Sequence, residues 1–350
     1  MIEIDGSWGE GGGQVLRTAL SLSLLTLRPV HIIHIRARRP NPGLQAQHLA
    51  AVRLAATVSH ARVAGDSPGS PELTFEPGQL MPGTYHFDIG TAGASSLVLQ
   101  TVWLPLALAS QPSTITLTGG THVPWSPCFH YLAWQWLPYL RKIGLDGELV
   151  LERAGFYPQG DGFIRATIQP VGTSRDRSKH LKPLRLLERG ALRGIRGISA
   201  VANLNLSIAE RQRKQALQRL SGRTRALEIE IVNLPSRFKG TLLLLQAEFR
   251  HASACYFGLG APGKPAERVA DEAVDALEEF LDSGAAIDQY LADQLLLPLA
   301  FAAGASEYRT ARVTQHLLTN AWVIETFGVA RIEVQGEMGR PGLVRIVPQV

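Results

Sequence analysis

The fold of this chain is decided at residues 10–25, which read EGGGQVLRTALSLSLL, a glycine-rich turn followed by an apolar helix. A second copy of this pattern is expected at residues 90–109, and a third, with less glycine, at residues 290–302. Each copy is followed by another predicted helix. These second helices are expected at residues 42–63, 126–143 and 314–327. Such self-similarity indicates an internal repeat.

Two landmarks measure the length of the repeat. Leu16 and Leu99 lie 83 positions apart, and Leu49 and Leu132 show the same separation. The third copy departs from it, because Leu317 follows Leu132 by 185 positions. The excess of about 102 residues predicts a domain inserted into the third copy.

The predicted insert comprises residues 184–276, which leaves residues 1–183 and 277–350 for the large domain. A polar, basic stretch at residues 174–182 marks its start. Strands and helices are expected to alternate inside it. The strands are predicted at residues 195–207, 226–232 and 240–248, and the helices at residues 208–219 and 265–281. The fold class is therefore α/β (α+β), with three repeated β-α units and a smaller inserted α/β domain.

Composition narrows the classes of protein. The net charge is +5 and the isoelectric point is near 9.4, which favours a phosphate-bearing partner. Two cysteines form neither a disulfide framework nor a metal cluster, so we expect a protein of the reducing cytoplasm. The apolar run at residues 97–109 contains Pro105 and is too short for a bilayer, and residues 1–5 resemble a strand rather than a secretory leader. No membrane association is expected.

The first motif, residues 5–17, reads DGSWGEGGGQVLR and has two interpretations. Its glycines allow backbone N–H groups to approach a phosphate at the start of a helix. Alternatively, it is a strand-to-helix turn whose glycines serve packing alone, since it matches neither a Walker A nor a Rossmann fingerprint. Glu10 beside a phosphate would be unfavourable unless it held a divalent cation or took part in the chemistry.

The second motif, residues 35–48, reads IRARRPNPGLQAQH. Its arginines are expected at the end of a strand, with Arg36 and Arg38 on one face and Arg39 opposite or in the turn. Guanidinium groups suit phosphate oxygens. The alternative is a solvated edge of a basic protein.

His316 is the candidate nucleophile, although most of the ten histidines need no special role. It lies at the start of a predicted helix in a chain that already has a candidate phosphate site. A neutral imidazole attacks phosphorus and forms a phosphoramidate, and a helix N-terminus would help to keep the ring neutral. A structural role is the alternative, and His48 is the equivalent residue of the first repeat.

Residues 290–294 read YLADQ and open the first helix of the third repeat. Tyr290 offers a stacking face, and Asp293 and Gln294 offer polar groups for a purine or ribose. The alternative is an ordinary acidic first turn of a helix.

These stretches, in this order, resemble the RNA 3'-terminal phosphate cyclase family over nearly the whole chain. Eight collinear motifs carry the resemblance. They are GEGGGQ at 9–14, RARR at 36–39, PGLQAQHL at 42–49, LVLQT at 97–101, GGT at 119–121, GFYP at 155–158, YLADQ at 290–294 and HLLTN at 316–320. Any one of them would be weak, whereas the ordered set is specific.

The resemblance implies a large domain of three β-α units, similar to the C-terminal domain of a translation initiation factor, with a smaller inserted domain. It implies ATP-dependent conversion of an RNA 3'-phosphate to a 2',3'-cyclic phosphodiester. The family also has a non-catalytic branch in ribosome biogenesis that lacks the histidine, so His316 places this chain with the enzymes.

The family mechanism implies a role for each matched residue. His316 takes AMP from ATP, the RNA 3'-phosphate takes the AMP, and the 2'-OH then displaces it. Arg17, Arg36, Arg39 and a divalent ion (Mg or Mn) at Glu10 would neutralise phosphoryl oxygens. The remaining nucleotide or phosphate contacts implied are Gln14, Gln47, Gln100, Pro127, Tyr290, Leu291, Ala292, Asp293 and Gln294.

The chain departs from the family pattern at three positions. Arg38 stands where many relatives carry glycine, Asp161 lies in a turn that is usually richer in glycine, and His130 occupies a position that is often acidic.

Two other functional classes remain open at this stage. One is a group-transfer enzyme on a similarly repeated scaffold, such as an enolpyruvyl transferase, which would form no covalent nucleotide. The other is a non-enzymatic RNA- or ribosome-binding module, which would not consume ATP. The sequence favours no particular oligomeric state, physiological RNA or role for the insert.

Overall fold

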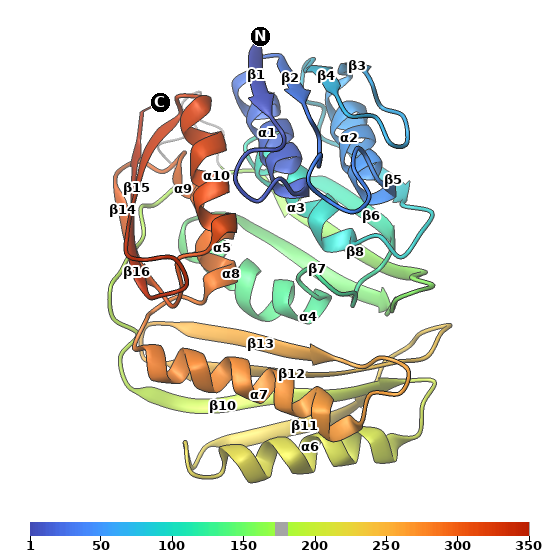
Figure 1. Cartoon of the computed structure of the whole chain (residues 1–350), viewed down its shortest axis with the longest axis vertical. Coiled ribbons are helices and arrows are strands. Elements are labelled where there is room, and N and C mark those ends of the chain that lie inside the picture. The colour runs from blue at the N-terminus through green and yellow to red at the C-terminus, as the bar shows by residue number, and fades with distance from the viewer. Residues whose placement is uncertain (172–180, 350) are drawn as a thin grey trace.

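A computed structural model describes residues 1–171 and 181–349. It shows a mixed α/β protein whose described residues form four sheets of four strands each (Figure 1). Most of the basic stretch predicted at residues 174–182 lies outside the described residues. No helix in the described part is long and apolar enough to cross a membrane.

The first sheet has the strand order β1-β2-β4-β3. β1 and β2 are parallel, and the other two pairs are antiparallel. A parallel pair needs a long crossover, which helix α1 supplies here. The elements are β1 (Ile2–Asp5), α1 (Gly13–Thr26), β2 (Val30–Ile33), α2 (Ala46–Ser59), β3 (Arg62–Ala64) and β4 (Leu73–Glu76).

The second sheet, β5-β6-β8-β7, has the same pattern of one parallel and two antiparallel pairs. Its crossover is helix α3, and a helix interrupted by a π-helical turn, η1, follows the second strand. The elements are β5 (Thr84–Asp88), α3 (Ser95–Ala107), β6 (Ser113–Gly119), α4 (Phe129–Tyr131), η1 (Leu132–Trp136), α5 (Leu137–Lys142), β7 (Asp146–Arg153) and β8 (Gly162–Gln169).

The third sheet repeats this pattern in the order β9-β14-β16-β15, with β9 and β14 parallel. Its crossover between the parallel strands is long, because it contains the whole fourth sheet as well as α8 and α9. The elements are β9 (Arg185–Leu186), α8 (Gln289–Gln294), α9 (Leu296–Leu299), β14 (Ser306–Thr310), α10 (Gln315–Thr326), β15 (Ala330–Gln335) and β16 (Gly342–Pro348).

The fourth sheet, β11-β10-β12-β13, lies below the others in Figure 1. The strands and helices predicted for this segment are present. One further strand, β13, was not predicted, because it is a short apolar run without alternation of apolar and polar residues. The elements are β10 (Leu192–Ala202), α6 (Leu206–Leu220), β11 (Leu227–Asn233), β12 (Gly240–Phe249), β13 (Ser253–Leu259) and α7 (Ala266–Ser283). The predicted limits of the insert, residues 184 and 276, do not coincide with element ends. At the first limit they include β9, which pairs with β14 of the third sheet, and at the second they cut α7, which continues to Ser283.

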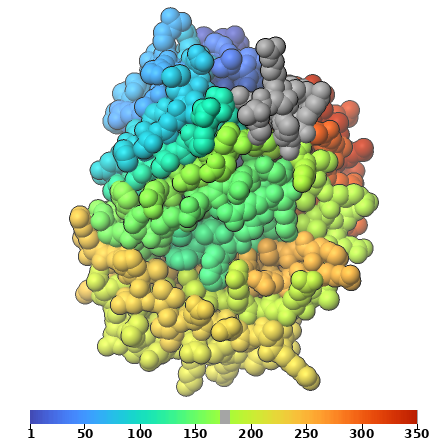
Figure 2. Space-filling view, turned by 180° about the vertical axis from the view of Figure 1, so that it is seen from behind, coloured from blue at the N-terminus to red at the C-terminus, as the bar shows by residue number. Residues whose placement is uncertain are grey.

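The two faces of the fourth sheet belong to different cores. Ile198, Leu242 and Leu244 pack into the large core that the other three sheets share. Leu243 and Leu245 point to the other face, where α6 and α7 cover a second core. Seen from behind, the green segments of the second sheet and its helices join the first-sheet segments above to the fourth-sheet segments below (Figure 2).

This shared core predicts cooperative unfolding. All six tryptophans lie outside residues 184–276, and of these Trp134 contacts Arg196 of the fourth sheet, so their fluorescence reports mainly on the other three sheets, whereas far-UV circular dichroism reports on the whole chain. In urea we expect both signals to change in one coincident transition. Leu244→Ala should lower the free energy of unfolding by about 2–5 kcal/mol in both signals, because it leaves a cavity in the shared core.

Leu243→Ala, the adjacent and equally buried leucine on the outer face, is the matched variant and should also shift both signals together. If it shifts only the circular dichroism, the fourth sheet unfolds independently.

Candidate functional site

Three helices from distant parts of the chain meet at one buried amide. Asn320 of α10 accepts a hydrogen bond from Thr18 Oγ1 of α1 at 2.7 Å and donates through Nδ2 to Asp293 Oδ1 of α8, also at 2.7 Å. Gln14 Nε2 donates to Thr18 Oγ1 at 3.2 Å. Residues near the start and the end of the chain are thereby joined into one site (Figure 1).

Glu10 lies at the centre of this site, in the glycine-rich turn before α1. One carboxylate oxygen, Oε1, pairs with the guanidinium of Arg39. The other, Oε2, lies 2.6 Å from His316 Nε2. The backbone N–H of Glu10 donates to Thr319 Oγ1 at 3.2 Å. The predicted carboxylate, one of the arginines and the predicted nucleophile are therefore in direct contact.

The carboxylates around His316 favour its charged form. Burial by itself would lower the pKa of His316, but Glu10 and Asp293 outweigh burial and raise the pKa above 6.5. For Glu10, burial favours the neutral carboxyl, but His316 and Arg39 outweigh it and lower the pKa. The effect expected of the helix start, a lower pKa of His316, is opposed by the nearby carboxylates, which raise the pKa.

The first turn of α1 is suited to an anion. Its N-cap is Gly12, and no side chain caps the first amides of the helix. Arg17 is half-buried one turn further on; burial lowers its pKa to about 10, against the attraction of Asp293 and Glu10, so it stays a cation at neutral pH. An anion here would meet free amides and two guanidinium groups, those of Arg17 and Arg39.

His48 has a structural role. Its Nδ1 accepts from the backbone N–H of Gln45 at 3.1 Å and so caps α2. Burial, with Arg17 and Arg36 nearby, lowers its pKa to about 3. A side chain at Gly13 would collide with the His48 ring, so this glycine allows α1 to approach the imidazole closely.

The arginine motif differs from its prediction. Strand β2 ends at Ile33, and Arg36 through Arg39 lie in a turn instead of at a strand end, so strand alternation does not orient them. Arg36 has a φ of 53° and donates to the backbone carbonyls of Asn41 and Gly43. Of the three arginines, Arg39 contacts Glu10, whereas Arg36 hydrogen-bonds within its own loop.

The other predicted residues lie on α2, α3 and α8 and in the loop before α4. Gln47 Oε1 accepts from the backbone N–H of Ala94 at 3.2 Å and so joins the starts of α2 and α3. Tyr290 is exposed, whereas Leu291 and Ala292 are buried. Gln294 has a buried Oε1 without a hydrogen-bond partner. No described contact joins Gln100 of α3 or Pro127, in the loop before α4, to Glu10 or His316.

Glu10 is the only predicted metal ligand, and a carboxylate is a suitable ligand for Mg²⁺. No group of three His, Cys, Asp or Glu side chains in the described residues could hold a metal by itself. Glu10 Oε2 is buried and lies 2.6 Å from His316 Nε2, and no other described contact engages this oxygen. Mg²⁺ is commonly bound by one or two carboxylates together with substrate phosphates, so Glu10 would hold the ion through Oε2, in exchange for its contact with His316, beside the anion site.

Sequence reasoning missed the stacking of Trp8 on Trp322 at a centroid distance of 4.4 Å, which holds the glycine-rich turn against α10. It also missed Thr18, a buried helix residue with no motif of its own. Asp161 has a φ of 54°, a conformation that glycine adopts without strain and aspartate tolerates, and it pairs with Arg153 at 3.0 Å and Arg237 at 3.4 Å.

His130, the third departure, places Nδ1 at 2.9 Å from His122 Nε2. Burial lowers the pKa of His130 to about 4, so this pair is neutral at physiological pH. It contributes no charge to the loop that carries Pro127.

The contact of His316 with Glu10 predicts a pKa change that can be measured without substrate. Glu10→Gln should lower the pKa of His316, because it removes the carboxylate that stabilises the imidazolium while the burial remains. Titration by NMR of imidazole-labelled protein, with the signal assigned by its loss in His316→Ala, checks this. Addition of Mg²⁺ should shift the wild-type pKa in the same direction.

Glu72→Gln removes an exposed carboxylate elsewhere and should leave the titration unchanged. An unaltered or higher pKa in Glu10→Gln would contradict the assignment of Glu10 as the dominant partner.

Comparison with known proteins provides independent evidence for the family of this chain. The family model described as RNA 3'-terminal phosphate cyclase matches residues 8–334. A protein named RNA 3'-terminal phosphate cyclase from Methylococcus capsulatus is 46% identical, over 99% of this chain and 96% of its own length. Proteins of the same name from Thermococcus kodakarensis and Gloeothece citriformis are 44% and 42% identical, over 100% and 96% of this chain and 99% and 96% of their own lengths.

Among solved structures, the enolpyruvyl transferase NikO from Streptomyces tendae matches 51% of this chain and 33% of its own, at 18% identity and a TM-score of 0.27. A likeness this weak supports no conclusion about fold or activity.

Proposed function

The chain belongs to the RNA 3'-terminal phosphate cyclase family, an enzyme family, and we propose that it converts an RNA 3'-terminal phosphate to a 2',3'-cyclic phosphodiester at the expense of ATP. The contact of His316 with Glu10, at the start of α1, is the observation that supports this most directly. It joins a nucleophile to an anion site with two nearby guanidinium groups.

In the first step, His316 Nε2 attacks the α-phosphorus of ATP, and pyrophosphate leaves. The ring must be neutral to attack, so the proton that Glu10 and Asp293 favour has to be lost first. Arg17, Arg39 and the free amides of α1 would stabilise the charge on the phosphoryl oxygens. A divalent ion (Mg or Mn) bound at Glu10 would neutralise phosphate charge and, by engaging the carboxylate, lower the pKa of His316.

In the second step, the RNA 3'-phosphate attacks the phosphorus of the His316-bound AMP and receives the nucleotide. In the third, the adjacent 2'-OH attacks the activated 3'-phosphorus and AMP leaves. The last step is intramolecular, so correct positioning supplies much of the acceleration. The remaining predicted contacts, Gln14, Gln47, Gln100, Pro127 and residues 290–294, are proposed to bind the nucleotide or its phosphates.

We further propose that the three sheets with the same strand order are repeats of one β-α unit, similar to the C-terminal domain of a translation initiation factor. The inserted domain, predicted at residues 184–276, is proposed to comprise β10 through α7, residues 192–283, because these elements surround the second core. Cys128 and Cys255 are free thiols, which agrees with the proposed cytoplasmic location.

The covalent intermediate is directly testable. Incubation with α-labelled ATP should label the wild-type protein through a phosphoramidate that is labile in acid and stable in base. His316→Ala should abolish both labelling and cyclisation. His48→Ala should retain labelling, because His48 caps α2 and does not contact Glu10. An adduct on the His316→Ala protein would show that the nucleophile is a different residue.

The chemistry of the RNA end is equally testable. An oligoribonucleotide with a 3'-phosphate should be cyclised, its terminal 2'-deoxy analogue should stop as the adenylylated 3'-end, and an RNA with a 3'-OH should do neither. Losing one charge-assisted phosphate contact costs about 1.5–3 kcal/mol, so Arg39→Ala should slow transfer to RNA by roughly ten- to a hundredfold.

Arg331→Ala, which removes an exposed arginine on β15, should leave the transfer rate unchanged. An equal loss in self-adenylylation would assign Arg39 to the ATP phosphates, and unaltered kinetics in both half-reactions would remove it from the site.

A further inference from the structure

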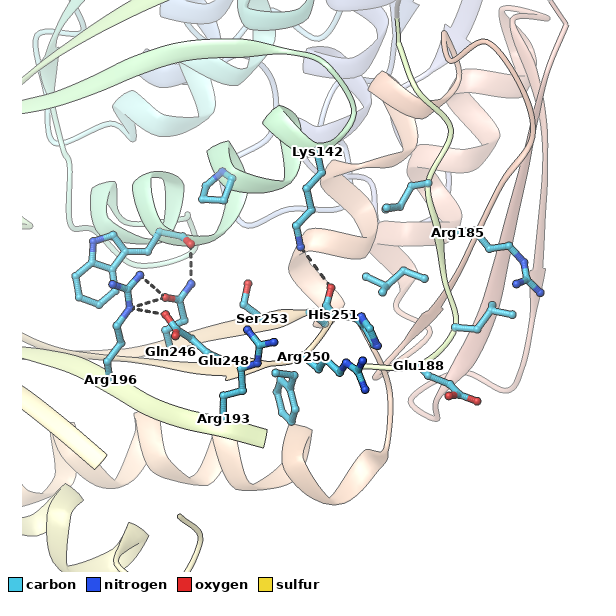
Figure 3. Close-up of a pocket in the computed structure, with 17 residues that line it drawn as sticks. Lys142, Arg185, Glu188, Arg193, Arg196, Gln246, Glu248, Arg250, His251 and Ser253 are labelled. Carbon is cyan, nitrogen blue, oxygen red and sulfur yellow. Dashed lines mark hydrogen bonds and ion pairs between the residues drawn. The ribbon is translucent and has the colours of Figure 1, made fainter. Parts of the chain in front are cut away.

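A basic groove lies where the fourth sheet meets the rest of the molecule. It is a hollow of about 990 Å³ between α5 and the strands β10 and β12, closed on one side by residues 184–188 (Figure 3). Five cations and two carboxylates line this junction groove. They are Lys142, Arg185, Arg193, Arg196, Arg250, Glu188 and Glu248.

A β-bulge orients one of these cations. The pairing of β10 with β12 shifts between Leu192 and Gly194, which leaves Arg193 as the extra residue. Side chains alternate along a regular strand, so residues 193 and 196 would point to opposite faces. The bulge reverses the alternation, and both Arg193 and Arg196 line the groove.

Two of the arginines are available to a ligand. Arg196 pairs with Glu248 at 2.9 Å and lies over the ring of Trp134, so its charge is already partnered. In the described part of the chain, no hydrogen bond or ion pair engages the side chains of Arg193 and Arg250, both of which are exposed. Figure 3 shows them reaching into the same space below Lys142. Burial lowers the pKa of Lys142.

Hydrogen bonds connect the groove to helix α8, whose residues are proposed to bind the nucleotide. Ser253, in its wall, donates to Gln135 Oε1 at 2.8 Å, and Gln135 Nε2 donates to Asp288 Oδ2 at 2.9 Å. Asp288 is the N-cap of α8 and accepts from the backbone N–H groups of Tyr290 and Leu291. Two side chains therefore separate the groove from the helix that carries Asp293.

We propose that the junction groove binds the phosphodiester backbone of the RNA upstream of its reacting 3'-end. The inference rests on the proposed function, which supplies a polyanion whose terminal phosphate is held elsewhere. Like charges such as those of Arg193 and Arg250 repel unless an anion lies between them, and guanidinium groups bind phosphate in bidentate fashion. The hollow is also far larger than one phosphate requires, and single strands are commonly bound in basic grooves that follow the backbone.

The test compares a long and a short RNA in one pair of charge-reversed variants. Arg193→Glu/Arg250→Glu changes the groove. Arg213→Glu/Lys214→Glu makes the same charge change on exposed residues of α6, which packs on the opposite face of the same sheet. The probes are a fluorescent single strand of about 20 nucleotides and a trinucleotide of the same terminal sequence, both with a 3'-phosphate, measured by anisotropy without ATP.

The groove variant should bind the long RNA at least tenfold more weakly than the α6 variant does, and the two should bind the trinucleotide equally. The plot of log K against log salt for the long RNA should become shallower by about 1.4, the value for two single-strand phosphate contacts. Self-adenylylation with α-labelled ATP should be unchanged in both variants, which shows that they are folded.

Equal binding of the long RNA by the two variants would overturn the inference, and that result is also the one expected if the groove serves an acidic protein. Equal weakening of the trinucleotide would overturn it too, because the arginines would then act on the reacting end. Binding is measured without turnover, so a chain that binds RNA through the groove but cyclises nothing would refute the proposed function and not the groove.

Discussion

The arrangement of this site depends on one buried amide, Asn320, which joins helices whose residues lie about 300 positions apart. Its carbonyl accepts from Thr18, and its amino group donates to both the backbone and the side chain of Asp293. A buried amide without its partners costs about 1–3 kcal/mol per lost hydrogen bond, so the three helices are held in a fixed relation. That relation brings the turn before α1 against the first turn of α10 and sets the contact of Glu10 with His316.

In the proposed mechanism, the carboxylate of Glu10 has different partners before and after ATP binds. Without ATP, it pairs with Arg39 and favours a protonated His316, which is a stable resting arrangement for three partly buried charges. A nucleophile needs the opposite, a neutral ring. Anything that engages the carboxylate of Glu10, such as a cation arriving with ATP, would favour loss of the proton. Activation of His316 would thereby follow from binding of the substrate.

The fourth sheet lies in the crossover between the parallel strands β9 and β14, a connection that is long in any parallel pair. The parallel pair β9 and β14 requires a crossover, and the sheet is inserted there between β9 and α8. Its inner face contributes to the large core, so the fourth sheet is packed against the other three sheets on one side and covered by α6 and α7 on the other. The junction groove is the part of this interface that remains open, which is why its exposed arginines can reach a ligand.

The sequence by itself predicted the helices, the mixed α/β class and the family, and it proposed His316 as the nucleophile. Repeat spacing and apolar periodicity are local properties, so they predicted the helices and a minority of the strands, among them β10, β11 and β12, and the ordered motifs identified the family. Two local features were not predicted from the sequence. Strand β13 has no alternation of apolar and polar residues, and the turn at Arg36 depends on backbone carbonyls of its own loop that no sequence pattern reveals.

Only the tertiary structure decided which residues meet. His316 and Glu10 are separated by more than 300 residues, and their contact depends on the hydrogen bond of Thr18 to Asn320 and on the stacking of Trp8 on Trp322, which no sequence motif reveals. The raised pKa of His316 follows from that contact and opposes the effect expected from a helix start alone. Charge depends on all neighbours in three dimensions, whereas a sequence pattern records only the neighbours along the chain.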